Sequence, residues 1–244
     1  MDPCQLVTEA ILALPAGRVR RVAIDGVDGA GKTHFADVLG KELTARGATV
    51  IRSSADSFLN PPRTRHRRGR DSAEGYYRDS FDYGRMCRLL LDPLSPGGNG
   101  EYVRAVYDVR REREVRVLPE LAPDDAILVV DGIFTHRDEL IRYWDYSVWL
   151  EVPFDVSIPR GAQRGHGDPN PASPKNRRYI EGQRLYMAEC HPQTRASVAV
   201  DNTNLVRPTL VTDTRESPVG NPRVSHSRPA SLPFTTRESP VHDR

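Results

Sequence analysis

The residues with the clearest chemical meaning lie between Asp25 and Thr33. An apolar run typical of a short buried strand ends at Asp25, and the pattern G-x-x-x-x-G-K-T follows from Gly26 to Thr33. Apolar residues at helical spacing continue after it. Between a strand and a helix, this pattern predicts a phosphate-binding loop (P-loop): backbone N–H groups and the helix N-terminus hold phosphate oxygens, Lys32 reaches the outer phosphates, and Thr33 offers its hydroxyl to Mg²⁺. The expected nucleotide contacts are Gly26, Asp28, Gly29, Ala30, Gly31, Lys32, Thr33 and His34.

Two aspartates follow segments that are typical of buried strands. Asp56 comes shortly after the apolar run that begins at Thr49, and Asp131 ends the β-branched run 126–130. In a parallel sheet both would reach the edge that carries the P-loop. There Asp56 could accept a proton from a substrate hydroxyl or help to hold Mg²⁺, and Asp131 could hold the metal's water shell. The alternatives are an ordinary turn or cap aspartate and a simple strand-end acid.

Arginines gather in two segments that could bind anions. Five of the eight residues from Arg63 to Arg70 are arginine, which suits a substrate or phosphate contact, a nucleic-acid patch or a solvated loop. Arg160 and Arg164 are four residues apart and would share one helix face. On a mobile lid at about 159–178 they could neutralise charge that develops on phosphates, although a solvated helix face remains open.

The segment 101–118 has the alternating character of a β-hairpin. Its strands are expected at 102–108 and 114–118, with a turn between them at 110–113. Such a hairpin could cover a substrate pocket with Tyr107 and Asp108, or it could be an ordinary strand pair.

The order of the remaining elements predicts an α/β fold. A helix at 6–14 precedes the P-loop strand, further buried strands are expected at 147–152 and 198–200, and a helix is expected at 179–189. A helix is also expected to begin at His136, with that histidine as a capping or surface residue. Alternating strands and helices favour a parallel sheet covered by helices on both faces.

Composition limits the class of protein. The chain has 244 residues, 38% of them hydrophobic, a mean hydropathy of −0.56 and a net charge of +2, which argues against nucleic acid as a partner. Its three cysteines show no metal or disulfide spacing. With no signal peptide and no apolar membrane span, we expect a soluble cytoplasmic protein with no membrane partner. We expect one domain over 1–209 and a disordered tail over 210–244, in which 214–219 recurs as 236–241.

These motifs together resemble the uridine kinase-like nucleoside kinases, a family of P-loop kinases. The resemblance rests on Gly26–Thr33, Asp56-Ser57-Phe58, Tyr107-Asp108, Asp131-Gly132 and the arginines at 160 and 164, and it covers about 19–204. It implies a sheet of about five parallel strands with a hairpin flap and a lid, and ATP or GTP with Mg²⁺. It also implies that Asp56 acts as general base on a ribose 5′-hydroxyl and that Arg164 contacts phosphates. The implied roles are catalytic for Asp56, Lys32 and Arg164; nucleotide-binding for Arg160; substrate-binding for Asp56, Phe58, Arg63, Tyr107 and Asp131; and metal-binding for Thr33 and Asp131.

The acceptor implied by this resemblance is uridine or cytidine, as in pyrimidine salvage. The sequence departs from the family at Gly161 and Gly165, where an arginine and an aspartate are usual. An acceptor that carries its own negative charge therefore stays open, as do a pantothenate-like or sugar-phosphate-like acceptor and a regulatory nucleotide-binding NTPase. A homo-oligomer also stays open, and the expected partner is a small molecule.

Overall fold

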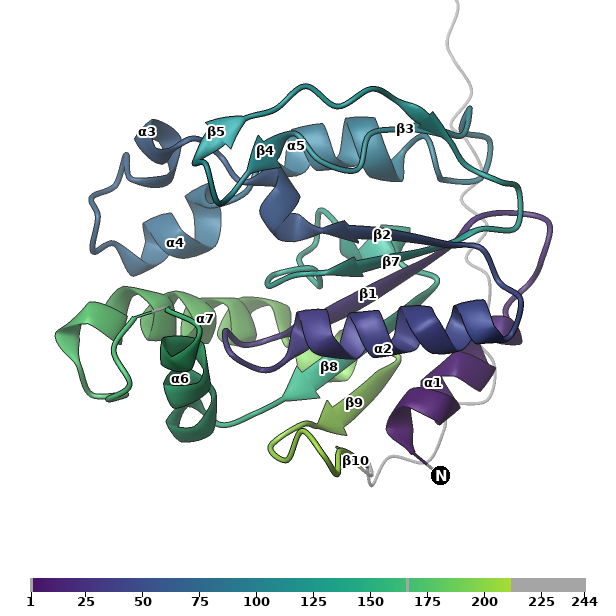
Figure 1. Cartoon of the computed structure of the whole chain (residues 1–244). Helices are drawn as coiled ribbons and strands as arrows, with labels where there is room; N and C mark the ends of the chain where they lie inside the picture. Colours follow the sequence, from purple (N-terminus) through teal and green to yellow (C-terminus); the bar gives the residue numbers. More distant parts are fainter. Residues whose placement is uncertain (1, 166, 212–244) are drawn as a thin grey trace, which may run out of the picture. The chain divides into compact units, whose positions relative to one another are not determined.

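A mostly parallel β-sheet forms the centre of the protein, whose computed structural model describes residues 2–165 and 167–211. The strand order of this six-stranded sheet is β10-β9-β8-β1-β7-β2, and all pairings are parallel except that of β10 with β9. The expected parallel α/β sheet is therefore confirmed, with an antiparallel edge strand added. The strands are β1 (Arg20–Gly26), β2 (Val50–Ser54), β7 (Ile127–Asp131), β8 (Tyr146–Glu151), β9 (Val198–Asp201) and β10 (Thr209–Leu210) (Figure 1).

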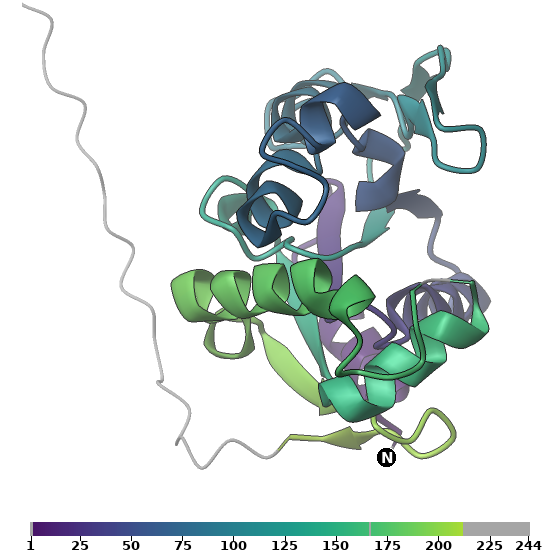
Figure 2. The ribbon, with the colours of Figure 1, turned by 90° about the vertical axis from the view of Figure 1, so that its left-hand side faces the viewer.

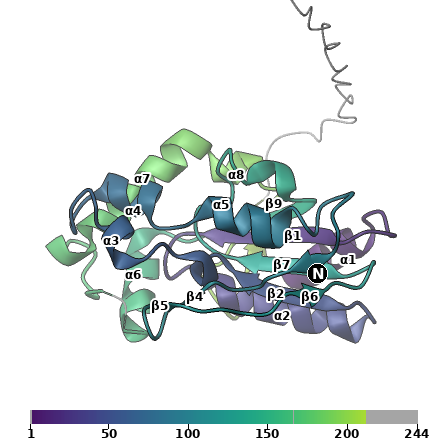
Figure 3. The same ribbon diagram turned by 90° about the horizontal axis from the view of Figure 1, so that it is seen from above.

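Helices cover both faces of the sheet. Figure 3 shows α1 and α2 on one side and α5, α7 and α8 on the other. The longer helices are α1 (Pro3–Leu12), α2 (Lys32–Ala45), α4 (Ala73–Asp79), α6 (Phe154–Gln163) and α7 (Arg177–Cys190). The shorter ones are η1 (Ala55–Phe58), α3 (Pro62–Arg65), α5 (Tyr83–Met86), η2 (Cys87–Leu91), η3 (Ile141–Tyr143), η4 (Pro174–Asn176) and α8 (Pro192–Arg195). None of the helices described is long and apolar enough to cross a membrane.

Strand β7 shows why the sheet is buried on both faces. All five of its residues are buried, and successive side chains alternate between two apolar clusters. Ile127 and Val129 join the cluster that contains residues of α1 and α2, whereas Leu128 and Val130 join the cluster that contains residues of α5 and η2. A central parallel strand therefore needs the continuous apolar run seen in the sequence.

The segment 101–121 forms two short ladders instead of one continuous hairpin. β4 (Tyr107–Asp108) pairs with β5 (Arg113–Glu114), as expected for the turn at 110–113. The outer ladder, however, joins β3 (Glu101–Tyr102) to β6 (Glu120–Leu121). The expected strand 102–108 is therefore interrupted at 103–106, and the expected strand 114–118 is wrong beyond its first residue. Leu118 is 77% exposed, so its side chain supplies little packing that would extend the ladder to the end of this stretch.

The expected helix at His136 is also wrong. Residues 132–140 are irregular, and η3 (Ile141–Tyr143) is the first helical turn after β7. Phe134 has a φ of +69°, which a right-handed helix cannot accommodate. Its ring lies edge-on to those of Tyr77 and Tyr186, at centroid distances of 5.2 and 5.0 Å. This packing offsets the backbone strain and turns His136 into the interior, where it is fully buried.

The residues that the structure describes all belong to one compact unit. The expected tail and its repeated motif lie outside the described residues from 212 onward, apart from residues 210 and 211 at its start.

An ion pair at the amino end of β1 generates a prediction about stability. Asp145 accepts from Nε of Arg21 at 3.1 Å and pairs with Arg18 at 2.9 Å. Desolvation works to raise the pKa of Asp145, but hydrogen bonds from Arg21 and the charge of that side chain hold this pKa below its ordinary value. We expect Asp145→Asn to lower the free energy of unfolding by about 3 kcal/mol at pH 7, since a largely buried guanidinium loses its partner.

The same pair predicts a pH dependence. Because the folded pKa lies below the unfolded value, the stabilisation is present above about pH 4 and is lost as pH falls through the folded pKa. Urea unfolding of both proteins at pH 7 and near pH 3 measures this, and the difference between them should shrink at the lower pH. An equal difference at both pH values would contradict the assignment.

Candidate active site

The P-loop lies at the carboxyl end of β1, on the left in Figure 1 and facing the viewer in Figure 2. Gly31, with φ of +92°, caps α2, whose first residues are Lys32 and Thr33. The ammonium of Lys32 donates to the carbonyls of Gly26 and Val27, both at 2.9 Å, and so lies across the mouth of the loop. His34 is exposed in the first turn of α2. The loop thus has the conformation that the motif predicts.

Two glycines allow other segments to pack directly on the loop. A methyl group at Gly29, where φ is +77°, would lie 2.0 Å from the carbonyl oxygen of Ser157 in α6. At Gly31 it would lie 2.9 Å from the side-chain amide of Asn202, which donates to the carbonyl of Ala30 at 2.7 Å. Helix α6 and the segment after β9 therefore pack so closely on the P-loop that a side chain at Gly29 or Gly31 would prevent the contact.

The tip of the loop is held by two helices. The carboxylate of Asp28 accepts from the hydroxyl of Tyr76 in α4 at 2.5 Å and from the amide of Gln183 in α7 at 3.3 Å. The backbone N–H of Asp28 donates to Gln183 at 2.7 Å. Helices α4 and α7 also pack against each other (Figure 2). Asp28, expected as a nucleotide contact, is thus a structural link between the loop and both helices.

Thr33 and Asp131 are brought together as the sequence suggests for a metal site. The hydroxyl of Thr33 donates to Oδ2 of Asp131 at 2.7 Å, and Oδ1 of Asp131 accepts from Arg52 at 2.9 Å. A hydroxyl and a carboxylate are oxygen ligands of the kind Mg²⁺ prefers, with phosphates and water completing its shell. The two side chains fit that ion, although the described residues contain no group of three or more His, Cys, Asp or Glu that could hold a metal by themselves.

Asp56 lies in η1, directly after β2. It is exposed, and its backbone N–H donates to the hydroxyl of Ser54 at 3.3 Å. A methyl group at Gly132 would lie 2.3 Å from Cβ of Ala55, so the residue after β7 packs its backbone directly on the first residue after β2. The carboxylates of Asp56 and Asp131 are therefore held on neighbouring strand ends. By contrast, Phe58 is fully buried in the core, where no ligand can reach it.

The hairpin brings Tyr107 to the arginine segment, but through Arg65 and not Arg63. Tyr107 is buried, and its hydroxyl accepts from Nη2 of Arg65 at 3.4 Å. Arg63, two residues earlier in α3, is exposed. The backbone N–H of Val106 donates to the carbonyl of Ser57 at 2.9 Å, so the hairpin is anchored beside Asp56.

The two lid arginines occupy different positions. Arg160 in α6 donates to the carbonyl of Asn202 at 3.0 Å and also to the carbonyl of Thr203. Arg164 caps the end of α6 and is exposed. Arg160 thus ties α6 to the segment after β9, in contact with the P-loop, whereas Arg164 points to solvent.

A buried polar network beneath the loop was not found from the sequence. Asp25 is fully buried and accepts from the backbone N–H and from Nδ1 of His136, at 3.1 and 2.9 Å, and from the hydroxyl of Tyr186. It also accepts from the N–H of Gly26 at 2.7 Å. Desolvation opposes ionisation, but hydrogen bonds and charge from His136, together with the other donors, keep the pKa of Asp25 below its ordinary value. The available signal was an acid directly before the first glycine of the motif.

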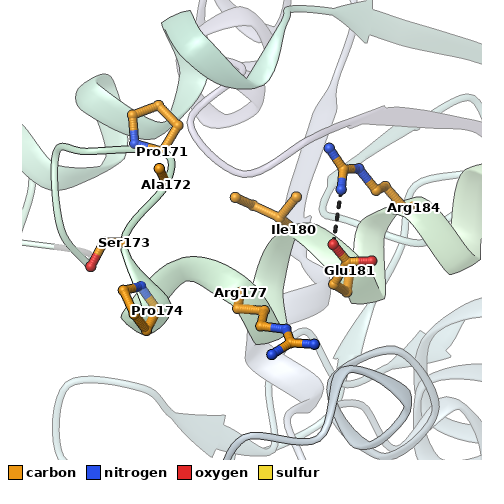
Figure 4. A pocket seen from close by; sticks show the side chains of 8 residues that line it. All are labelled: Pro171, Ala172, Ser173, Pro174, Arg177, Ile180, Glu181 and Arg184. Atoms are coloured by element: carbon orange, nitrogen blue, oxygen red, sulfur yellow. Dashed lines mark hydrogen bonds and ion pairs between the residues drawn. The ribbon is translucent and has the colours of Figure 1, made fainter.

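A cavity of about 340 Å³ lies elsewhere, at the start of α7. Figure 4 shows its lining, in which Arg184 pairs with Glu181 at 2.8 Å. No residue of the P-loop and none of the expected acceptor residues lines it. This cavity is therefore separate from the candidate active site.

No protein-family model matches the sequence, and a search of curated proteins also found no match. Solved structures match with TM-scores above one half. A provisionally assigned uridine kinase from Bacillus stearothermophilus has a TM-score of 0.65 at 21% identity, covering 80% of this chain and 96% of that one. A provisionally assigned fructose transport system kinase from Silicibacter sp. TM1040 has a TM-score of 0.59 at 23% identity, covering 76% and 92%.

A third match is D-glycerate 3-kinase from Cryptococcus neoformans var. grubii, with a TM-score of 0.51 at 11% identity, covering 85% of this chain and 96% of that one. At identities this low the likeness shows the fold alone. The chain has the fold of these P-loop kinases.

The close approach at Gly29 generates a prediction with an internal control. Gly47, just after α2, has a similar φ of +86° but no atom within 4 Å of an added methyl group. We expect Gly47→Ala to cost about 1 kcal/mol of stability, the backbone strain alone. Gly29→Ala should cost more and should also weaken ATP–Mg²⁺ binding at least about 10-fold, because either the loop or α6 must move. Urea unfolding and calorimetric titration measure both effects, and equal behaviour of the two variants would contradict the steric argument.

Proposed function

We propose that this protein transfers the γ-phosphoryl group of ATP or GTP, in the presence of Mg²⁺, to a hydroxyl group of a small metabolite. The observation that carries the proposal is the meeting of P-loop and acids at one sheet edge. Thr33 bonds Asp131, and Gly132 brings Asp131 next to the turn that carries Asp56. The likeness in fold to kinases supports the same reaction.

The donor side is the P-loop. Its backbone N–H groups and the N-terminus of α2 hold the phosphates, and Lys32 turns from the loop carbonyls to the outer phosphates. Thr33 and, through water, Asp131 would hold Mg²⁺, which would supply positive charge beside the phosphates. Arg160 and Arg164 add positive charge from α6. Positioning and charge neutralisation thus supply most of the catalysis.

The acceptor side begins at Asp56. Its carboxylate takes the proton of the acceptor hydroxyl while that oxygen bonds to the γ-phosphorus. The bond from this phosphorus to the β–γ bridging oxygen breaks, and ADP or GDP leaves with the electron pair. Asp56 suits this role because it is exposed on a strand end beside the P-loop.

The motifs favour uridine or cytidine as acceptor, by the resemblance described above. A second candidate class is another small metabolite, such as a sugar, a sugar phosphate or a hydroxy acid. This second class is favoured by the hydrogen bond from Arg65 to the hydroxyl of Tyr107. Tyr107 is the residue expected to approach a nucleobase, and its hydroxyl is already bonded to an arginine. A regulatory NTPase would need no acceptor at all.

The direct test is consumption of ATP and of GTP across nucleosides, pantothenate, sugars, sugar phosphates and hydroxy acids. Acceptor-dependent release of ADP or GDP, with one phosphoryl group recovered on the acceptor, would establish the reaction. Hydrolysis that no acceptor stimulates would favour the regulatory NTPase. If the protein does not bind ATP–Mg²⁺, both the kinase hypothesis and the regulatory NTPase hypothesis are wrong.

Substitution of Asp56 tests the general base. We expect Asp56→Asn to bind ATP–Mg²⁺ normally and to lower kcat by about 100-fold or more, the usual scale for a positioned base. The matched control is Asp124→Asn, which changes an exposed aspartate just before β7, at the opposite end of the sheet. Steady-state kinetics with the best acceptor measure both, and unchanged turnover in Asp56→Asn would remove Asp56 from the mechanism.

A further inference from the structure

We propose that the acceptor carries a negatively charged group, a carboxylate or a phosphate, and that Arg65 and Arg178 bind it while Asp56 faces its hydroxyl. This inference rests on the proposed phosphoryl transfer and adds the chemical class of the substrate. It comes from a cluster that we name the arginine clamp, made of Arg65, His66, Arg70 and Arg178.

Contacts with two aromatic rings and two further residues hold Arg178 in place, but they do not use all of its hydrogen-bond donors. Its guanidinium carbon lies 5.6 Å from the ring centre of Tyr76 and 5.2 Å from that of Tyr179. Nη1 donates to the carbonyl of Arg70 at 2.5 Å and lies 3.2 Å from Nδ1 of His66. Nε is buried and has no hydrogen-bond partner among the described residues. A buried donor without a partner is costly, and an anion would supply the missing acceptor.

Arg65 has the same property on the other side of His66. Its side chain is 17% exposed, Nη2 bonds the hydroxyl of Tyr107 and pairs with Glu112 at 3.1 Å, and Nε is buried with no partner in the part of the chain described. Glu112 is itself 67% exposed, so its charge is well screened by water. Arg65 is thus next to His66 in sequence, Arg178 contacts this histidine, and both arginines have a buried Nε without a partner in the part of the chain described.

The cluster has an excess of positive charge. Arg67 and Arg68, nearby in sequence, both pair with Asp79, and Arg68 also pairs with Glu74 at 3.6 Å. The groups that act on His66 are different. Desolvation, then the charges of Arg178, Arg65 and Arg70, lower the pKa of His66, and the charge of Glu112 opposes them. Three arginines against one exposed glutamate favour a bound anion.

The clamp lies next to the proposed general base. Arg178 stacks on Tyr76, whose hydroxyl bonds Asp28 of the P-loop. The hydroxyl of Tyr107 bonds Arg65, and the backbone N–H of the preceding Val106 donates to the carbonyl of Ser57, the residue after Asp56, at 2.9 Å. The electrostatics agree, because desolvation and then the carboxylates of Asp28 and Asp56 raise the pKa of Tyr76. One small molecule could therefore contact Asp56 with a hydroxyl and the clamp with an anionic group.

Arginine suits this task better than lysine. A guanidinium offers a planar fork of donors that matches a carboxylate or a phosphate, and it stacks on aromatic rings. A neutral nucleoside would leave both Nε groups unpaired, whereas a hydroxy acid or a sugar phosphate would pair them. The chemistry shared by these two classes is an oxyanion a few bonds away from the reacting hydroxyl.

The first experiment compares matched acceptors that differ in charge and keep the reacting hydroxyl: glycerol with D-glycerate, fructose with fructose 6-phosphate, panthenol with pantothenate, and uridine with its 6-carboxylate, orotidine. ADP release is measured at saturating ATP–Mg²⁺. We expect the anionic member of the active pair to give at least about 10-fold higher kcat/KM than the neutral one. Comparison of the carboxylate acceptors with the phosphate acceptors shows which of the two anionic groups the clamp binds. If the neutral member is better, the inference is overturned while the kinase function stands.

Variants locate the effect. Arg65→Gln and Arg178→Gln should each raise KM for the anionic acceptor about 10-fold or more, with a smaller change in kcat. Arg184→Gln, on the exposed face of the same helix α7, is the matched control and should leave both constants unchanged. Circular dichroism and thermal unfolding check that each variant is folded. Wild-type KM in both clamp variants would overturn the inference.

If no acceptor in the panel is phosphorylated, direct binding decides. Inorganic phosphate and D-glycerate are titrated by calorimetry into protein saturated with ADP–Mg²⁺, which keeps the P-loop occupied. Binding that weakens at least about 10-fold in both clamp variants but not in Arg184→Gln supports the clamp. No binding, or equal binding in all four proteins, overturns it, and nucleotide binding measured separately tests the proposed function on its own.

Discussion

The carboxylate of Asp25 is the interaction on which the site depends most. It is fully buried, and its donors come from three places: the first residue of the P-loop, the segment after β7, and α7. An unpaired charge in this position would cost several kcal/mol, so the three segments must assemble together to satisfy it. Because α7 is joined to the P-loop in this way, its outer turns carry Gln183 to the tip of the loop and Arg178 to the acceptor side.

Much of the fold could be predicted because its strongest signals are local. The apolar runs of β1, β7 and β8 are continuous, since each strand is buried on both faces, and the P-loop pattern joins a strand to a helix in a few residues. What could not be predicted depends on distant partners. Strand β10 has two residues and exists only because β9 offers an edge. The turn at Phe134 is held by rings from α4 and α7, which no local pattern describes.

The candidate site divides in the same way. Lys32, Thr33 and Asp131 could be found because motif and strand end place them by backbone alone. On the acceptor side, Phe58 is in the core and Arg65 takes the position expected of Arg63, because a short helix decides which side chain points inward. Asp25 and Tyr186 are 161 residues apart, so their contact is a property of the folded chain and not of any motif. Site residues that a local motif positions can be predicted from the sequence, whereas site residues that depend on tertiary contacts cannot.

Gly132 separates two properties of the site that usually vary together. The spacing between the segments that carry Asp56 and Asp131 depends on Gly132, which packs so closely on Ala55 that an added methyl group would overlap Cβ of that residue. Exchange of either acid therefore alters charge and leaves the spacing intact. Exchange of the glycine would alter the spacing and leave both charges intact. The spacing of the two acids and their charge thus depend on different residues.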